Sequence, residues 1–170
     1  MAKVDPTNQA NQVKPIPEGY STVVPYISVK GAADAIAYYK KAFGAEELVR
    51  MPLPDGKVGH AELKFGDSIL MLADEMDHPD AIAKSPRTLG GVTSGLCLYV
   101  ADCDTMFNRA VDAGGKVRRP LTTQFYGDRS GTLEDPFGQC WTISTHVEDV
   151  SPDEMKRRME AFAKDMSKKG

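Results

Sequence analysis

His60 and Glu62 are the clearest candidates for acid–base chemistry in this chain. They alternate with Ala61 and Leu63, and side chains two residues apart on a strand share one face of a sheet. A carboxylate beside an imidazole can act as a general base or form half of an unusual metal site. The alternatives are a solvent-exposed cross-strand pair and a packing histidine held by a hydrogen bond. Both residues are therefore candidate catalytic residues.

A second polar group lies toward the C-terminal end. Thr142 and His146 fall at period two, which predicts that they share a face, with His146 near its rim. Arg129, in one motif with Tyr126, could bind a carboxylate or phosphonate through two parallel hydrogen bonds. Two alternatives stay open: Asp128 neutralises Arg129 in a structural pair, and His146 fixes the end of its strand.

Ligand pockets are mostly apolar with a few polar anchors, which adds Ile69, Met71 and Phe125 as candidates for an apolar wall. The predicted ligand-binding residues are Ile69, Met71, Phe125, Tyr126, Arg129, Thr142 and His146.

Composition excludes several classes of function. Lys plus Arg number 21 against 24 Asp plus Glu, a net charge of -3 that gives no basic patch for nucleic acid or an anionic membrane. No apolar run approaches the length of a membrane span, and no signal-peptide core is visible, so we expect a cytoplasmic protein. Three cysteines without CxxC spacing argue against a disulfide framework or a structural zinc site. Phosphate loops, GxGxxG, GxSxG and HExxH motifs are absent.

Apolar periodicity predicts the elements that must position these residues. A strand at 22–29, a helix at 32–43 ending at Gly44, and strands at 46–52, 59–65 and 68–73 form one βαβββ unit, about 20–75. The order then repeats after a polar linker at 76–92. The second unit, about 93–147, has a strand at 94–100, a helix at 104–113 and strands at 117–121, 131–134 and 139–144.

FGDSILML at 65–72 and FGQCWTIS at 137–144 occupy the same place in each half. Such repetition predicts an α+β fold of two paired modules in one domain, 20–150. Two unrelated α+β stretches are the alternative.

The two ends differ in character. Residues 1–19 are polar and predict a flexible arm. Ser151, a proline and Glu154 open a predicted helix over 151–170 with a capping box. Its apolar stripe of Met155, Met159, Phe162 and Met166 packs either on its own domain or on a partner subunit.

Several motifs together resemble the vicinal oxygen chelate superfamily of glyoxalase, bleomycin-resistance and dioxygenase proteins, in its PhnB-like branch. They are GHAEL at 59–63, GDSILMLAD at 66–74, YGDR at 126–129, DPFG at 135–138 with Trp141, THVED at 145–149, and the run at 25–44. The resemblance covers about residues 20–160. It implies a cupped mixed sheet that holds the site, with helices on the convex face.

Metal-dependent members of that superfamily place four ligands in the cup, on the first and last strands of each module. The matching positions here are Pro25 or Val24, Gly95 or Leu96, Met71, and Thr142. None is His, Glu or Asp, so we expect no metal and no other cofactor. Without the metal, the superfamily's usual lyase, isomerase or dioxygenase chemistry has no Lewis acid.

The sequence therefore predicts a homodimeric protein that binds a small, partly apolar molecule in a cleft without catalysing a reaction. The alternative is a lyase, isomerase or dioxygenase that uses a relocated metal or His60 and Glu62 as an acid–base pair.

Overall fold

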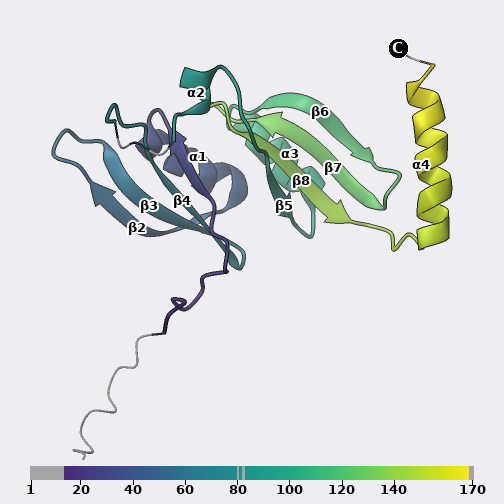
Figure 1. Ribbon diagram of the computed structural model, residues 1–170, viewed down its shortest axis with the longest axis horizontal. Helices are drawn as coiled ribbons and strands as arrows, with labels where there is room; N and C mark the ends of the chain where they lie inside the picture. Colours follow the sequence, from purple (N-terminus) through teal and green to yellow (C-terminus); the bar gives the residue numbers. More distant parts are fainter. Residues whose placement is uncertain (1–13, 80, 82, 169–170) are drawn as a thin grey trace, which may run out of the picture.

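The first module is the predicted βαβββ unit. The computed structural model of the chain describes residues 14–79, 81 and 83–168. Strand β1 (Tyr26–Val29) leads into helix α1 (Ala32–Phe43), followed by β2 (Glu46–Pro52), β3 (Val58–Phe65) and β4 (Ser68–Asp74) (Figure 1). The sheet order is β1-β4-β3-β2, with β1 parallel to β4 and the other pairs antiparallel.

Local sequence explains where the first elements begin and end. Strand β1 is shorter than the predicted 22–29 because Pro25 has no N–H for the ladder; its carbonyl still accepts from Met71. Helix α1 ends at Gly44, whose φ of 70° is the left-handed conformation that suits a helix C-cap.

The second module repeats the first, as the sequence predicted. It consists of β5 (Leu96–Tyr99), α3 (Cys103–Asp112), β6 (Lys116–Thr123), β7 (Asp128–Glu134) and β8 (Cys140–His146). The sheet order β5-β8-β7-β6 has the same parallel and antiparallel pairs as the first sheet. Asp102 caps α3 by accepting a 3.0 Å hydrogen bond from the backbone N–H of Thr105.

The predicted linker contains a short helix that periodicity does not reveal, α2 (Pro86–Leu89), with Ser85 as its N-cap. The hydroxyls of Ser85 and Thr88 donate to Glu75 just beyond β4, at 2.5 and 2.6 Å. These hydrogen bonds hold the linker against the first module.

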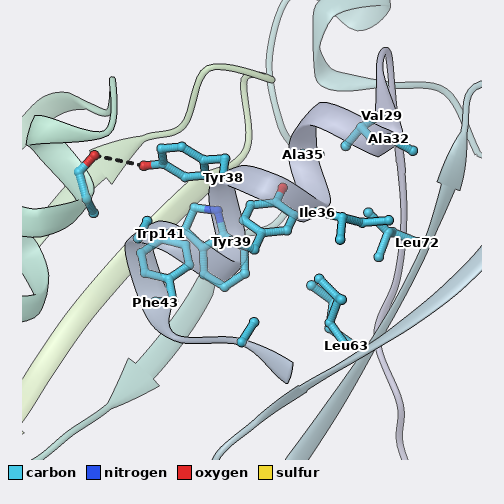
Figure 2. Close-up of a cluster of buried hydrophobic side chains, with 14 of the residues drawn as sticks. Val29, Ala32, Ala35, Ile36, Tyr38, Tyr39, Phe43, Leu63, Leu72 and Trp141 are labelled. Carbon is cyan, nitrogen blue, oxygen red and sulfur yellow. Dashed lines mark hydrogen bonds between the residues drawn. The ribbon is translucent and has the colours of Figure 1, made fainter. Parts of the chain in front are cut away.

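One hydrophobic core joins the modules, because α1 and α3 pack against each other and each covers one face of its own sheet. Figure 2 shows Tyr38, Tyr39 and Phe43 of α1 around Trp141 of β8. Phe43 and Trp141 have ring centroids 4.7 Å apart, and Trp141 is 1% exposed. Tyr38 donates to the Ala110 carbonyl at 3.1 Å, which adds a hydrogen bond between the helices.

Each sheet therefore has a second face that neither α1 nor α3 covers, which we call the open face of that module. Helix α4 (Pro152–Met166) lies at the outer end of the second module, beside the turn between β6 and β7 (Figure 1). None of the helices in the described part of the chain is long and apolar enough to cross a membrane. The predicted arm at 1–19 lies largely outside the described residues.

Candidate functional site

The open face of module one carries a hydrogen-bonded network around His60. Its Nε2 lies 3.2 Å from Oε1 of Glu62, and its Nδ1 lies 3.3 Å from the hydroxyl of Tyr26. The hydroxyl of Tyr20 donates to the other oxygen of Glu62. The two residues predicted to share a face are thus in contact, and both imidazole nitrogens have partners.

These contacts favour the ionised form of Glu62. The hydrogen bond from Tyr20 lowers the pKa of the carboxyl, burial opposes it, and the bond with His60 lowers it further, so the net pKa lies below the ordinary value. A carboxylate with a lowered pKa is a weaker base. The network therefore suits recognition of a donor group better than proton abstraction.

Met71 supplies the apolar part of the same face. Its Cα partners are Tyr26 on one side and Glu62 on the other, so these three residues form a row across β1, β4 and β3. Ile69, two residues earlier on β4, is 5% exposed and lines a pocket of about 250 Å³ between the modules, together with Leu96 and Cys97.

The corresponding row of module two is polar. It runs across four strands from Cys97 through Thr142 and Thr132 to Arg119, each of which is the Cα partner of the next. The hydroxyls of Thr132 and Thr142 lie 3.0 Å apart. Nε and Nη2 of Arg119 donate to the Thr132 hydroxyl at 3.2 and 3.0 Å. Predicted residue Thr142 is therefore central to this open face.

His146 lies at the end of the same face, in a second network. Its Nδ1 lies 2.8 Å from Asp128 and its Nε2 lies 2.9 Å from Asp149. Tyr99 donates to Asp128 at 2.7 Å, and this bond is the main reason that the pKa of Tyr99 is raised to about 12. Asp149 and then Asp128 raise the pKa of His146 by stabilising the imidazolium.

Other predicted site residues lie elsewhere. Arg129 points to the helix side of its sheet, where it forms a two-bond ion pair with Asp104 of α3, both bonds 2.6 Å long. This placement corrects the expectation that Arg129 faces the cup, and its structural partner is Asp104 rather than Asp128. Phe125 belongs to the turn between β6 and β7, where its ring packs on Phe162 of α4 with centroids 5.0 Å apart. Tyr126 is in the same turn.

Arg119 is the site residue that the sequence reasoning missed. Its strand reads KVRRPLTT, without the alternation that assigns side chains to faces. A register shift lies between Val117 and Arg119, and a bulge of this kind changes which residues face the same way. Only the pairing of Arg119 with Thr132 in the folded sheet shows that Arg119 belongs to this row.

The residues at the four positions that match the superfamily's ligand positions do not fit its divalent metal. The structure places Tyr26 and Cys97 opposite Met71 and Thr142, one residue beyond the first-strand positions read from the sequence. A phenol, a thioether, a thiol and a hydroxyl are a poor ligand set for such a metal, and Arg119 adds a positive charge nearby. In the described ranges, three or more His, Cys, Asp or Glu side chains nowhere gather in a way that could hold a metal ion.

Comparisons with known proteins agree with this architecture. A family model described as Glyoxalase/Bleomycin resistance protein/Dioxygenase superfamily matches residues 21–143. The chain is 40% identical to uncharacterized protein Rv0887c of Mycobacterium tuberculosis over 136 residues, which is 79% of this chain and 80% of that protein.

Solved structures show the same fold. TioX from Micromonospora sp. ML1 superposes with a TM-score of 0.59 at 25% identity, over 75% of this chain and 99% of TioX. The PhnB protein from Bacillus cereus, titled a putative 3-demethylubiquinone-9 3-methyltransferase, gives a TM-score of 0.56 at 16% identity, over 74% of this chain and 99% of its own. At that identity the second likeness concerns the fold alone.

Proposed function

Since this chain belongs to the glyoxalase/bleomycin resistance/dioxygenase superfamily, we propose that it binds a small, partly apolar molecule on the open faces of its two sheets, without the usual metal. The observation that carries the proposal is the pair of equivalent rows. Tyr26, Met71 and Glu62 present an apolar centre between polar groups in module one, and the equivalent row in module two is polar. Few polar anchors beside apolar surface are typical of small-molecule sites.

The side chains at the superfamily's metal-ligand positions support binding of a small molecule rather than metal-assisted catalysis. The four positions that match the superfamily's ligand positions carry a phenol, a thioether, a thiol and a hydroxyl, and of these only the thiol is a common ligand for a divalent ion that could polarise a carbonyl. The three cysteines are free thiols, which fits a reducing compartment. We place the protein in the cytoplasm as part of the same proposal.

A second copy of the chain is the partner that we propose. Helix α4 buries none of its residues, and Met159 is 53% exposed. One side of the helix forms an open surface made of Pro152, Met155, Lys156, Met159, Glu160 and Ala163. Phe162, on another side, packs on Phe125. Arg158 also donates to Glu148, so α4 is held to its own chain on that side, and its exposed methionines are available to a second copy.

Charge on α4 favours a copy of itself as that partner. Lys156 and Glu160 border the exposed methionines, and neither forms an ion pair with another described residue. In an antiparallel pair about a two-fold axis near Met159, each Lys156 faces Glu160 of the other copy. A helix pair alone buries less than the roughly 1,000 Å² expected of a stable interface, so we expect a weak or auxiliary contact.

Amide shift mapping tests the binding function. A ¹⁵N-labelled sample titrated with a library of small aromatic and aliphatic molecules should show shifts that cluster on the rows containing Met71 and Thr142. Met71→Glu should weaken binding about tenfold or more because it puts a charge at the apolar centre, whereas Met166→Glu, the same change at an exposed position on α4, should not. Binders that shift only residues away from both open faces would refute the proposal.

The alternative function is catalysis by His60 and Glu62, which is favoured by their direct contact. It predicts turnover of methylglyoxal-type or catechol substrates that His60→Ala and Glu62→Gln each abolish while the protein stays folded. Metal analysis of the purified protein separates the two functions further, since the binding proposal expects well under one equivalent of transition metal. Metal-dependent turnover would decide for the enzyme.

A further inference from the structure

Five arginines in the described part of the chain are neutralised by a carboxylate: Arg50, Arg118, Arg129, Arg157 and Arg158. Three have no carboxylate partner among the described residues, and of these only Arg119 donates to a side-chain hydroxyl. Arg87 and Arg109 donate to backbone carbonyls. Arg119 bonds only to the hydroxyl of Thr132, so its positive charge has no acidic partner among the described residues.

The hydrogen bonds of Arg119 fix one edge of the guanidinium and leave the other available. Nε and Nη2 both donate to the same oxygen of Thr132. Nη1, with two N–H groups, has no partner within the residues described. A guanidinium presents its donors as a planar fork that matches two oxygens of a carboxylate, sulfonate or phosphonate. Thr132 thus orients the fork, because the contact fixes a side chain that would otherwise rotate freely.

The nearby acidic groups on this face are already engaged. Glu134 accepts from Arg118, and Asp128 accepts from Tyr99 while contacting His146. Beside Arg119, the row continues with the hydroxyls of Thr132 and Thr142 and the thiol of Cys97. These groups are neutral, so an anion bound to the guanidinium meets no opposing charge along the row.

We propose that the ligand is an organic anion whose acidic group binds the free edge of Arg119 while the rest of the molecule lies along the row toward Cys97. This inference rests on the proposed binding function and names its ligand class. Carboxylate, sulfonate and phosphonate share the required chemistry, which is a planar or tetrahedral group with two oxygens available to one guanidinium edge.

A matched pair of probes tests the inference. 1-Naphthoate and its neutral isostere 1-naphthamide have the same ring system and nearly the same shape, and their binding is measured by titration into ¹⁵N-labelled protein, which gives both the affinity and the residues whose amide signals shift. The wild-type protein should bind naphthoate about tenfold more tightly than naphthamide at low salt, as expected for a charge-assisted pair. The preference should shrink in 1 M NaCl because salt screens an exposed pair. Inorganic phosphate and acetate as competitors show which kind of oxyanion the site prefers.

Three variants distinguish a specific contact with Arg119 from a general effect of positive charge on this strand. Arg119→Gln should remove the preference for naphthoate and leave naphthamide binding unchanged. Arg119→Lys retains the charge without the fork and should give an intermediate preference. Lys116→Gln removes one positive charge from an exposed position at the start of the same strand and should behave as wild type. Melting curves establish that each variant is folded.

The outcomes distinguish this inference from the function on which it rests. Equal binding of both probes by the wild type would overturn the anion inference and leave the binding function standing. A preference that survives in Arg119→Gln, or is lost equally in Lys116→Gln, would also overturn it. Failure of both probes to shift any residue of the two open faces would count against the binding function itself.

Discussion

The hydroxyl of Tyr39, on helix α1 of the first module, donates a 2.8 Å hydrogen bond to Oδ2 of Asp135 in the second module. Trp141 donates to the same oxygen at 2.9 Å, and the backbone N–H groups of Phe137 and Gln139 donate to the other oxygen at 2.8 and 2.9 Å. Asp135 is 2% exposed, and burial raises its pKa although these donors oppose the shift. A satisfied polar cluster thus joins the modules inside their common core.

Tyr39→Phe should destabilise the protein by about 1–3 kcal/mol, because it leaves a buried carboxyl with one donor fewer. Urea denaturation measures the change in the free energy of unfolding. Tyr38→Phe is the matched control, since Tyr38 also bonds between the helices but to the neutral carbonyl of Ala110. We expect it to cost about 0.5–1.5 kcal/mol. Equal costs for the two variants would contradict a special role for Asp135.

Glu75 should make stability depend on acidic pH. Hydrogen bonds from Ser85 and then Thr88 lower its pKa from 4.5 to about 2. Because the folded-state pKa is the lower one, the stabilisation is fully present above about pH 4.5 and is lost as the pH falls toward 2.

Glu75→Gln should therefore lower the melting temperature at pH 6 and have a much smaller effect at pH 2.5. Thermal melts of both proteins across this range measure the difference. Glu46→Gln, at an exposed position on β2, controls for the loss of a carboxylate. A Glu75→Gln effect of constant size at all pH values would show that the carboxylate charge is not involved.

Met159→Glu should weaken self-association, because it places a charge at the centre of the exposed side of α4. Sedimentation velocity over a range of protein concentrations measures the monomer fraction, which should rise in this variant. Lys164→Glu, an exposed polar position on the same helix, should leave association unchanged. If the wild type is monomeric at all concentrations, or if Met159→Glu associates like the wild type, the proposed helix pair is wrong.

Much of the fold could be predicted from sequence because it depends on local patterns of apolar spacing and helix-ending residues. Helix α1 matches the predicted 32–43, since its apolar spacing and Gly44 define both the buried face and the end. Trp141 points to the core as strand alternation requires. Helix α2 was not predicted, because four residues are too few to show periodicity and its cap partner, Glu75, is ten residues from Ser85.

The sequence by itself determined the two repeated modules, the face shared by His60 and Glu62, and the face shared by Thr142 and His146. Period-two alternation depends only on neighbours in one strand. The tertiary structure decided the partners: Asp104 for Arg129, Asp128 and Asp149 for His146, and Thr132 for Arg119. Strand register and bulges set these contacts between segments distant in the chain, and a one-residue change in register would turn each side chain to the opposite face.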